Sequence, residues 1–267
     1  MAQLIGGIKF KGTIENLSAY TMRGSDKVIL RKKGGPKTEQ IKKSPQFENV
    51  RRNNSEWSGC TMAAKNIRNA IFNIRHLADY NISGPLNGIV KTAQKLESEG
   101  VWGERAIYFS KFKELFEGFN LNQKRLFDGV VRVPIMAGID RESKCATVSI
   151  PPIWPNIQLD NTYKHPLCRF VVSFGLVSDV MYNENLKIYQ PIKEYPQTHG
   201  VCKQTEWRNT KEPFQAEEII LTLDQETEIG EFDSMVLGIG IEFGNPLTAQ
   251  IVEPIKYSGS AKVMLIR

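Results

Sequence analysis

The spacing of hydrophobic residues changes twice along the chain, near residue 45 and near residue 120. Before residue 45, apolar and polar positions alternate, as in Ile8-Lys9-Phe10. A period of two predicts strands with one apolar face, here over residues 4–12 and 14–22. Arg23-Gly24-Ser25-Asp26 then resembles a hairpin turn. We predict a β-ribbon arm over residues 1–44, with interacting side chains at Ile8, Phe10, Ile14, Leu17, Tyr20, Val28 and Leu30.

Residues 45–120 have the three-to-four spacing of helices. Ser44-Pro45 is typical of a helix start, because serine caps the first turn and proline is tolerated there. The pattern predicts an amphipathic helix of about thirty residues, or two helices broken near Ser58-Gly59. A second helix is predicted from Ser83 and a third over residues 104–118. Together they predict a small helical unit.

After residue 120, β-branched and aromatic residues occur in short runs between Pro, Gly and Asn. No helical pattern separates these runs, which favours an antiparallel β-sandwich. The glycines of Leu237-Gly238-Ile239-Gly240 are expected to allow close packing. The predicted fold class is therefore α+β, with an arm (1–44), a helical unit (45–120) and a β-sandwich domain (121–267). The predicted strands cover residues 129–133, 145–150, 169–177, 186–189, 218–223, 235–243, 249–252 and 261–266.

Positive charge is concentrated in the N-terminal quarter. Residues 1–75 contain 15 Lys and Arg against 5 Asp and Glu, a net charge of +10. The whole chain carries +6, so the remainder carries −4. This asymmetry indicates polyanion binding or docking on an acidic neighbour, although solvated charges on an exposed ribbon would look the same. The predicted basic surface comprises Lys32, Lys33, Lys37, Lys42, Lys43, Arg51, Arg52 and Arg68.

Apolar runs such as Phe170-Val171-Val172 are too short to span a bilayer. The N-terminus lacks the apolar core of a secretory signal. We therefore expect a cytoplasmic protein with no membrane segment, either free or within a phage-like particle. Four cysteines, scattered along the chain, are too few for a disulfide framework.

Two His-x2-Cys pairs are the sharpest candidate for chemistry. His165 with Cys168, and His199 with Cys202, could supply a two-His, two-Cys zinc site. Against this, Cys168 begins a predicted strand, in which residues i and i+3 face opposite sides. Four isolated side chains are therefore the alternative interpretation.

The sequence lacks the usual signatures of catalysis. There is no Gly-x-Ser-x-Gly elbow, no His-Glu-x-x-His helix and no phosphate-binding loop. Only three histidines are available as bases. We accordingly predict no enzymatic activity and no cofactor.

Four blocks of sequence resemble a family of Bacteroidetes proteins for which we know no established activity. Phe10-Lys11-Gly12-Thr13-Ile14, with Asn16-Leu17-Ser18 and Tyr20, precedes Arg31-Lys32-Lys33-Gly34-Gly35. The other blocks are Arg51 to Trp57 with Ala63 to Arg68, Phe116 to Asn120, and Leu237 to Phe243. The resemblance implies the same layout of arm, helices and β-domain, and no particular chemistry.

These observations favour a non-enzymatic structural protein that self-assembles into a particle, tube or filament. A phage-tail-like or virion-like subunit would use the arm for contacts in a homo-oligomer. The alternative is a nucleic-acid-binding protein that contacts phosphates through its basic N-terminal quarter.

Overall fold

The computed structural model describes residues 12–21, 27–32, 34–248 and 250–267. The chain divides into two compact units, Met1–Arg51 (unit 1) and Arg52–Arg267 (unit 2). The observed architecture mixes helices with several antiparallel sheets, which confirms the mixed α and β character expected from the sequence. No helix in the described ranges is long and apolar enough to cross a membrane.

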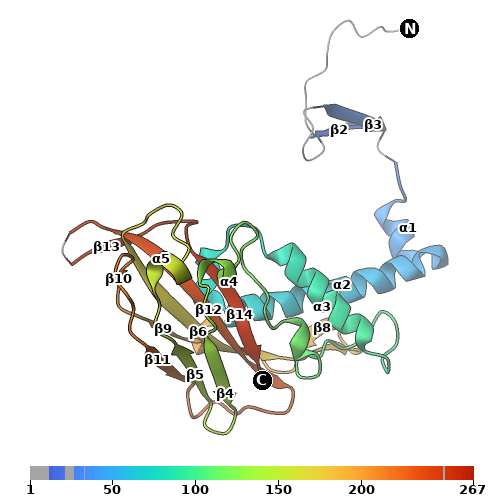
Figure 1. The fold of residues 1–267 in the computed structure, drawn as a ribbon. Coiled ribbons are helices and arrows are strands. Elements are labelled where there is room, and N and C mark those ends of the chain that lie inside the picture. Colours follow the sequence, from blue (N-terminus) through green and yellow to red (C-terminus); the bar gives the residue numbers. More distant parts are fainter. Residues whose placement is uncertain (1–11, 22–26, 33, 249) are drawn as a thin grey trace, which may run out of the picture. The chain divides into compact units, whose positions relative to one another are not determined.

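Unit 1 holds a three-stranded antiparallel sheet with the order β1-β2-β3 (Figure 1). Its strands are β1 Gly12–Ile14, β2 Leu17–Thr21 and β3 Val28–Lys32. A two-residue turn at Glu15-Asn16 joins β1 to β2, with Glu15 in the left-handed region at φ 47°. Ile14 therefore belongs to β1, and not to the predicted strand over 14–22. Two short helices follow, α1 Thr38–Lys43 and η1 Pro45–Phe47.

The register gives this small sheet one apolar face. Ile14 lies opposite Leu17, Ala19 opposite Leu30, and Thr21 opposite Val28. Because directly opposite residues point to the same side, this face carries Ile14, Leu17, Ala19, Val28 and Leu30, together with Thr21 and Lys32.

Tyr20 lies on the other face, where the Arg31 guanidinium sits 5.4 Å from its ring centroid. Tyr20, one of the predicted interacting side chains of the arm, therefore lies on the opposite face from Leu17 and Leu30. Ile8, Phe10, Lys33 and the predicted turn at residues 23–26 lie outside the described residues.

A six-stranded antiparallel sheet organises unit 2. Its central pair is β6 Leu167–Ser178 and β12 Asp233–Pro246, in register from Ser178 opposite Asp233 to Leu167 opposite Gly244. The strands β9 Val201–Gln204 and β10 Arg208–Asn209 pair with β6, and β13 Val252–Pro254 and β14 Ser260–Ile266 pair with β12.

Both faces of this sheet are covered. Val171, Val177 and Val236 enter a hydrophobic cluster with α2 Glu48–Ala70, η2 Phe72–Leu77 and α3 Ser83–Leu96. The alternate residues, such as Phe170 and Ile239, join a second cluster with a three-stranded sheet. That sheet has the order β11-β5-β4 and consists of β4 Met136–Asp140, β5 Cys145–Ile150 and β11 Glu217–Thr222. Figure 1 shows the helices and the smaller sheet on either side of β6 and β12.

The remaining elements of unit 2 are short. They are η3 Lys113–Leu115, α4 Phe127–Val130, α5 Pro155–Gln158 and η4 Gln197–His199, with a separate hairpin of β7 Val180–Asn183 and β8 Ile188–Pro191. The helices share a hydrophobic cluster with the large sheet, so the predicted boundary near residue 120 does not separate two cores.

Glycines in the central strands let the helical layer approach the sheet closely. A Cβ placed on Gly175 would lie 2.5 Å from the carbonyl oxygen of Ala70, and one on Gly238 would lie 2.5 Å from Cδ1 of Ile74. A Cβ on Gly240 would overlap Leu77. The expectation that Gly238 and Gly240 allow close packing is thus confirmed. The segment that packs closely against these glycines is Ala70–Leu77.

One helix prediction is confirmed in one of its two alternatives, and another differs from the structure. The first helix runs unbroken through Ser58-Gly59, and Gly59 leaves room for the Tyr189 ring, which would lie 2.6 Å from a Cβ at that position. The third, over 104–118, was wrong, since only η3 is helical there. Ile107 instead forms a β-bridge with Val180.

Among the predicted strands, β5 has the expected bounds, β11 is shifted by one residue, and β6, β12 and β14 extend slightly beyond theirs. The predicted strand over residues 129–133 was wrong, because Phe127–Val130 forms a helical turn. The short strands β4, β7, β9 and β10 were not predicted. Their segments carry few β-branched residues, and pairing with longer neighbours defines them.

The close approach at Gly175 can be tested by substitution. Gly175→Ala should lower the free energy of unfolding by about 1–3 kcal/mol, because the new methyl group meets backbone atoms of Ala70 that cannot rotate away. Denaturant unfolding monitored by circular dichroism measures the change.

The matched control is Gly138→Ala in β4, where a new Cβ meets nothing within 4 Å. That variant should stay within about 0.5 kcal/mol of the wild type. Equal losses in the two variants would show that replacing any strand glycine matters, and that the helix contact does not.

Candidate functional site

The two His-x2-Cys pairs do not come together. Cys202 lies on β9 opposite Ser173 of β6, five residues along the strand from Cys168. At about 3.3 Å per residue, this separates the two cysteines by roughly 16 Å, far beyond what one zinc ion can bridge. The His165 ring packs against Tyr163 and Phe243, and the His199 ring against Tyr195. Among the described residues, no three His, Cys, Asp or Glu side chains are placed to hold a metal.

Glu56, a buried carboxylate on α2, is the centre of a cluster of charged side chains in the helical layer. Its side chain is fully buried and accepts hydrogen bonds from Arg105 (Nε, 2.7 Å; Nη2, 2.8 Å), Lys91 (2.5 Å) and the Gly103 N–H (3.0 Å). Burial by itself raises the pKa of Glu56. The hydrogen bonds from Arg105, Lys91 and Gly103 outweigh that effect and hold the pKa at about 2.

Neutral groups complete the surroundings of Glu56. Gln94 is buried beside it and bonds to Lys91, to the Cys60 thiol and to the Arg105 carbonyl. The Tyr189 hydroxyl donates to the carbonyls of Gly103 and Arg105. The charges of Glu56, Arg105 and Lys91 are paired with one another, and the bonds from Gly103 and Arg105 to Glu56 fix the loop at residues 103–105.

Asp179 has a similar role at the junction of β6 and β7. Its buried carboxylate accepts bonds from the N–H groups of Phe109 (2.6 Å) and Ser110 (3.1 Å), and from the Ser110 hydroxyl (2.5 Å). Burial raises the pKa of Asp179. These bonds take the N–H groups that the predicted helix over residues 104–118 would have used internally.

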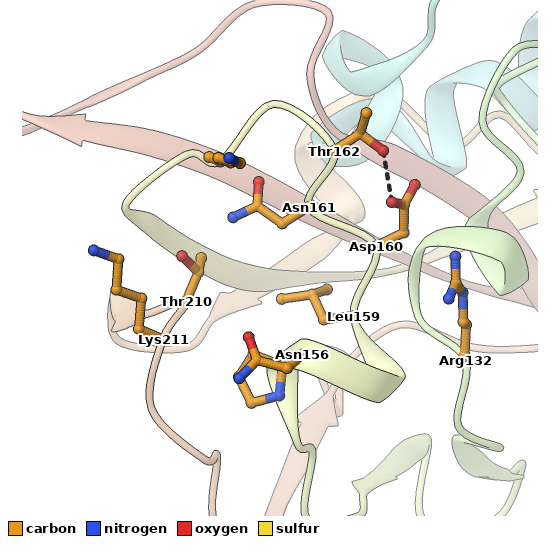
Figure 2. A pocket seen from close by; sticks show the side chains of 10 residues that line it. Arg132, Asn156, Leu159, Asp160, Asn161, Thr162, Thr210 and Lys211 are labelled. Carbon is orange, nitrogen blue, oxygen red and sulfur yellow. Dashed lines mark hydrogen bonds between the residues drawn. The ribbon is translucent and has the colours of Figure 1, made fainter.

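A polar cleft of about 480 Å³ opens beside α5 (Figure 2). Its carboxylate, Asp160, is already bonded to Thr162 (2.7 Å) and Arg125 (2.9 Å). Asn161 is held by the backbone of His165 through both its amide nitrogen and its oxygen. Asp160 and Asn161 are therefore both engaged in bonds that hold the loop around the cleft. Its lining comprises Arg132, Pro155, Asn156, Leu159, Asp160, Asn161, Thr162, Lys164, Thr210 and Lys211.

The described residues of the predicted basic surface divide between the two units. Lys32, Lys37, Lys42, Lys43 and Arg51 belong to unit 1, and Arg52 and Arg68 to unit 2, while Lys33 lies outside the described residues.

Two of these arginines are engaged within their own units. Arg51 donates to the carbonyls of Ile41 and Ser44, both at 2.8 Å, and so ties α1 to the start of α2. Arg52 stacks on the Trp102 ring at 5.6 Å. Arg68 lines a cleft on α2.

Comparisons with protein-family models, with curated proteins and with solved structures returned no match. The resemblance to the Bacteroidetes family therefore stays a prediction.

Sequence reasoning missed the two buried carboxylates. One signal for Glu56 was present, because it precedes Cys60, Ala63 and Ile67 on the buried face of α2, at helical spacing. A charge within an apolar helical stripe indicates a buried partner. Asp179 follows a continuous apolar strand, and nothing local distinguishes it from a residue at a strand end.

The Glu56 cluster makes stability depend on pH in acid. The pKa of Glu56 is lower in the folded protein than its ordinary value of 4.5. The contribution of Glu56 to the free energy of unfolding is therefore complete above about pH 4.5 and is lost as the pH falls towards 2. Glu56→Gln should remove this part of the acid dependence and destabilise the fold at pH 7 by about 3–5 kcal/mol, because Arg105 and Lys91 lose their partner.

Denaturant unfolding between pH 7 and pH 2.5 measures both effects. Glu218→Gln, at an exposed position of β11, is the control and should unfold as the wild type does at every pH. If Glu56→Gln keeps the wild-type acid dependence, the loss of stability in acid comes from other carboxylates.

Proposed function

We propose that this chain is a non-enzymatic structural protein that assembles with copies of itself through the arm in unit 1. The observation that carries the proposal is the bare apolar face of the β1-β2-β3 sheet. Ile14, Leu17, Val28 and Leu30 on that face are 57, 41, 40 and 46 % exposed. Ala19 is the one buried hydrophobic side chain among the described residues of unit 1.

A sheet of this size needs a partner. Its strands are three to five residues long and bury only Ala19 among their described side chains, which is too little apolar surface to be stable alone in water. An apolar face flanked by strand edges is also the kind of surface that adds to another sheet. The arm therefore gains most of its stability from whatever covers Ile14, Leu17, Val28 and Leu30.

Charge favours the body of a neighbouring copy as that partner. Residues 1–51 carry 11 Lys and Arg against 4 Asp and Glu, a net charge of +7, so residues 52–267 carry −1. Two arms would repel each other, whereas an arm and a near-neutral body would not. An arm that binds the body of the next copy makes a head-to-tail contact, and repeated contacts of this kind close into rings or continue as tubes or filaments.

The body has the features of a rigid subunit. We interpret the six-stranded sheet and the β11-β5-β4 sheet as the predicted β-sandwich, since they share one hydrophobic cluster. The sheet edges approach each other, with β9 beside β11 and β14 beside β4. The outer edge of β14 is further covered by backbone bonds to residues 118–121. A phage-tail-like or virion-like subunit is the closest functional analogy.

A pair of substitutions on opposite faces tests the arm. Leu30→Glu should weaken self-association by about 2 kcal/mol or more, because it places a charge in the apolar contact. Tyr20→Glu is the matched control, since Tyr20 is 39 % exposed on the other face and should leave association unchanged. Sedimentation velocity across a concentration series measures both. Equal effects would locate the contact elsewhere.

Removing residues 1–43 is expected to leave a folded monomer. Both hydrophobic clusters lie in unit 2, so the truncated protein keeps its core. Circular dichroism and light scattering together check folding and mass. A full-length protein that is monomeric at high concentration, or a truncated one that still assembles, contradicts the proposal.

A further inference from the structure

The outward face of α2 forms one wall of a groove. The opposite face, with Cys60, Ala63 and Ile67, is buried in the core. The groove is about 550 Å³ in volume and its other wall is the segment from Pro191 to Pro196. A second hollow of about 380 Å³ at Phe72, Asn73, Arg75 and His76 follows along η2. We call the two together the α2 groove; its larger part is lined by Ser58, Thr61, Met62, Lys65, Asn66, Arg68, Asn69, Pro191, Glu194, Tyr195 and Pro196.

The cations that line this groove differ from five arginines elsewhere in unit 2. Arg105, Arg125, Arg169, Arg208 and Arg267 each pair with a carboxylate. Within the described residues, Lys65, Arg68 and Arg75 form no ion pair. They lie at helical spacing along one side of α2 and η2, over roughly 15 Å at 1.5 Å per residue.

The two arginines are close enough to affect each other. Burial, and then the charge of Arg75, lower the pKa of Arg68. Like charges held together without a counter-charge cost stability, which is typical of a surface that binds an anion. Glu194 is the one carboxylate that lines the groove. Glu242, which His76 contacts at 3.0 Å, is already paired with Arg169.

Aromatic and amide groups lie beside these cations. Phe72 is 44 % exposed, and the Arg75 guanidinium lies 5.7 Å from its ring centroid. Tyr195 lines the facing wall, and Asn66 and Asn73 lie along the same helical face. Cations next to an exposed ring and to amides form the combination that binds phosphates and stacks unpaired bases.

We propose that the α2 groove binds single-stranded nucleic acid, with Lys65, Arg68 and Arg75 on the phosphates and Phe72 under a base. A duplex would leave Phe72 unused, because its bases are already stacked. An acidic peptide would use the cations and leave the ring without a stacking partner. This inference is independent of the proposed assembly and uses residues of unit 2 alone.

The test is binding of a fluorescein-labelled oligothymidine to the full-length protein, followed by anisotropy across a salt series. Arg68→Gln with Arg75→Gln should weaken binding by at least about tenfold and reduce the salt slope by about 1.4, since each lost phosphate contact on a single strand removes about 0.7. Phe72→Leu should weaken binding about fivefold or more with little change of slope.

Two charge-matched variants are the controls. Arg132→Gln with Lys211→Gln removes two charges from the cleft beside α5, and Lys42→Gln with Lys43→Gln removes two from unit 1. Each should change binding by less than about twofold, because neither pair lines the groove. Equal weakening in all three double variants, or a loss confined to the unit 1 variant, overturns the proposal.

The groove variant should fold normally, because it breaks no ion pair and removes a like-charge contact. Its thermal midpoint should equal or exceed that of the wild type. If it unfolds instead, Lys65→Gln at an exposed position still tests the site, and the slope of binding against salt should fall by about 0.7. No binding at low salt, or displacement of the oligonucleotide by polyglutamate at lower concentration than by unlabelled oligothymidine, rules out a nucleic-acid site.

Discussion

The close contact between the segment Ala70–Leu77 and the glycines of β6 and β12 controls the arrangement of unit 2. Gly175, Gly238 and Gly240 have no side chain where Ala70, Ile74 and Leu77 meet the sheet. The end of α2 and η2 can therefore lie almost on the backbone of the central strands. The depth of that contact also sets which residues of α2 remain outside, and these line the α2 groove. A larger residue in the sheet would lift the helix and disturb both its core face and the groove.

Two buried carboxylates then hold the part of the chain that has the least regular structure. Between α3 and α4, the described backbone forms only one short helical turn, η3. Glu56 binds Gly103 and Arg105, and Asp179 binds Phe109 and Ser110. A carboxylate that accepts backbone N–H bonds satisfies polar groups that would otherwise be buried without partners. In this region, side-chain acceptors replace the hydrogen bonds of a helix.

These contacts explain which parts of the fold could be predicted. The first two helices and the long strands were predictable because their own spacing matches the surface that they bury. The helix over 104–118 was not, because Ile107 and Phe109 have helical spacing but are fixed by Val180 and Asp179, seventy or more residues away. Tyr20 lies on the opposite face from Leu17 because the two residues are three positions apart in one strand, and side chains alternate between the faces of a strand. The zinc hypothesis was wrong because register, rather than spacing, separates Cys168 from Cys202.

The covered central pair has a consequence for the order in which the chain is made. β6 is synthesised long before β12 and β14. Pairings between distant segments form slowly, because the entropy cost of closing a long loop comes before any contact stabilises the pair. Until β12 and β14 leave the ribosome, the six-stranded sheet is incomplete, and the apolar sides of α2 and β6 stay partly uncovered. During synthesis, the segments most in need of protection from misassembly are therefore those that end up deepest inside.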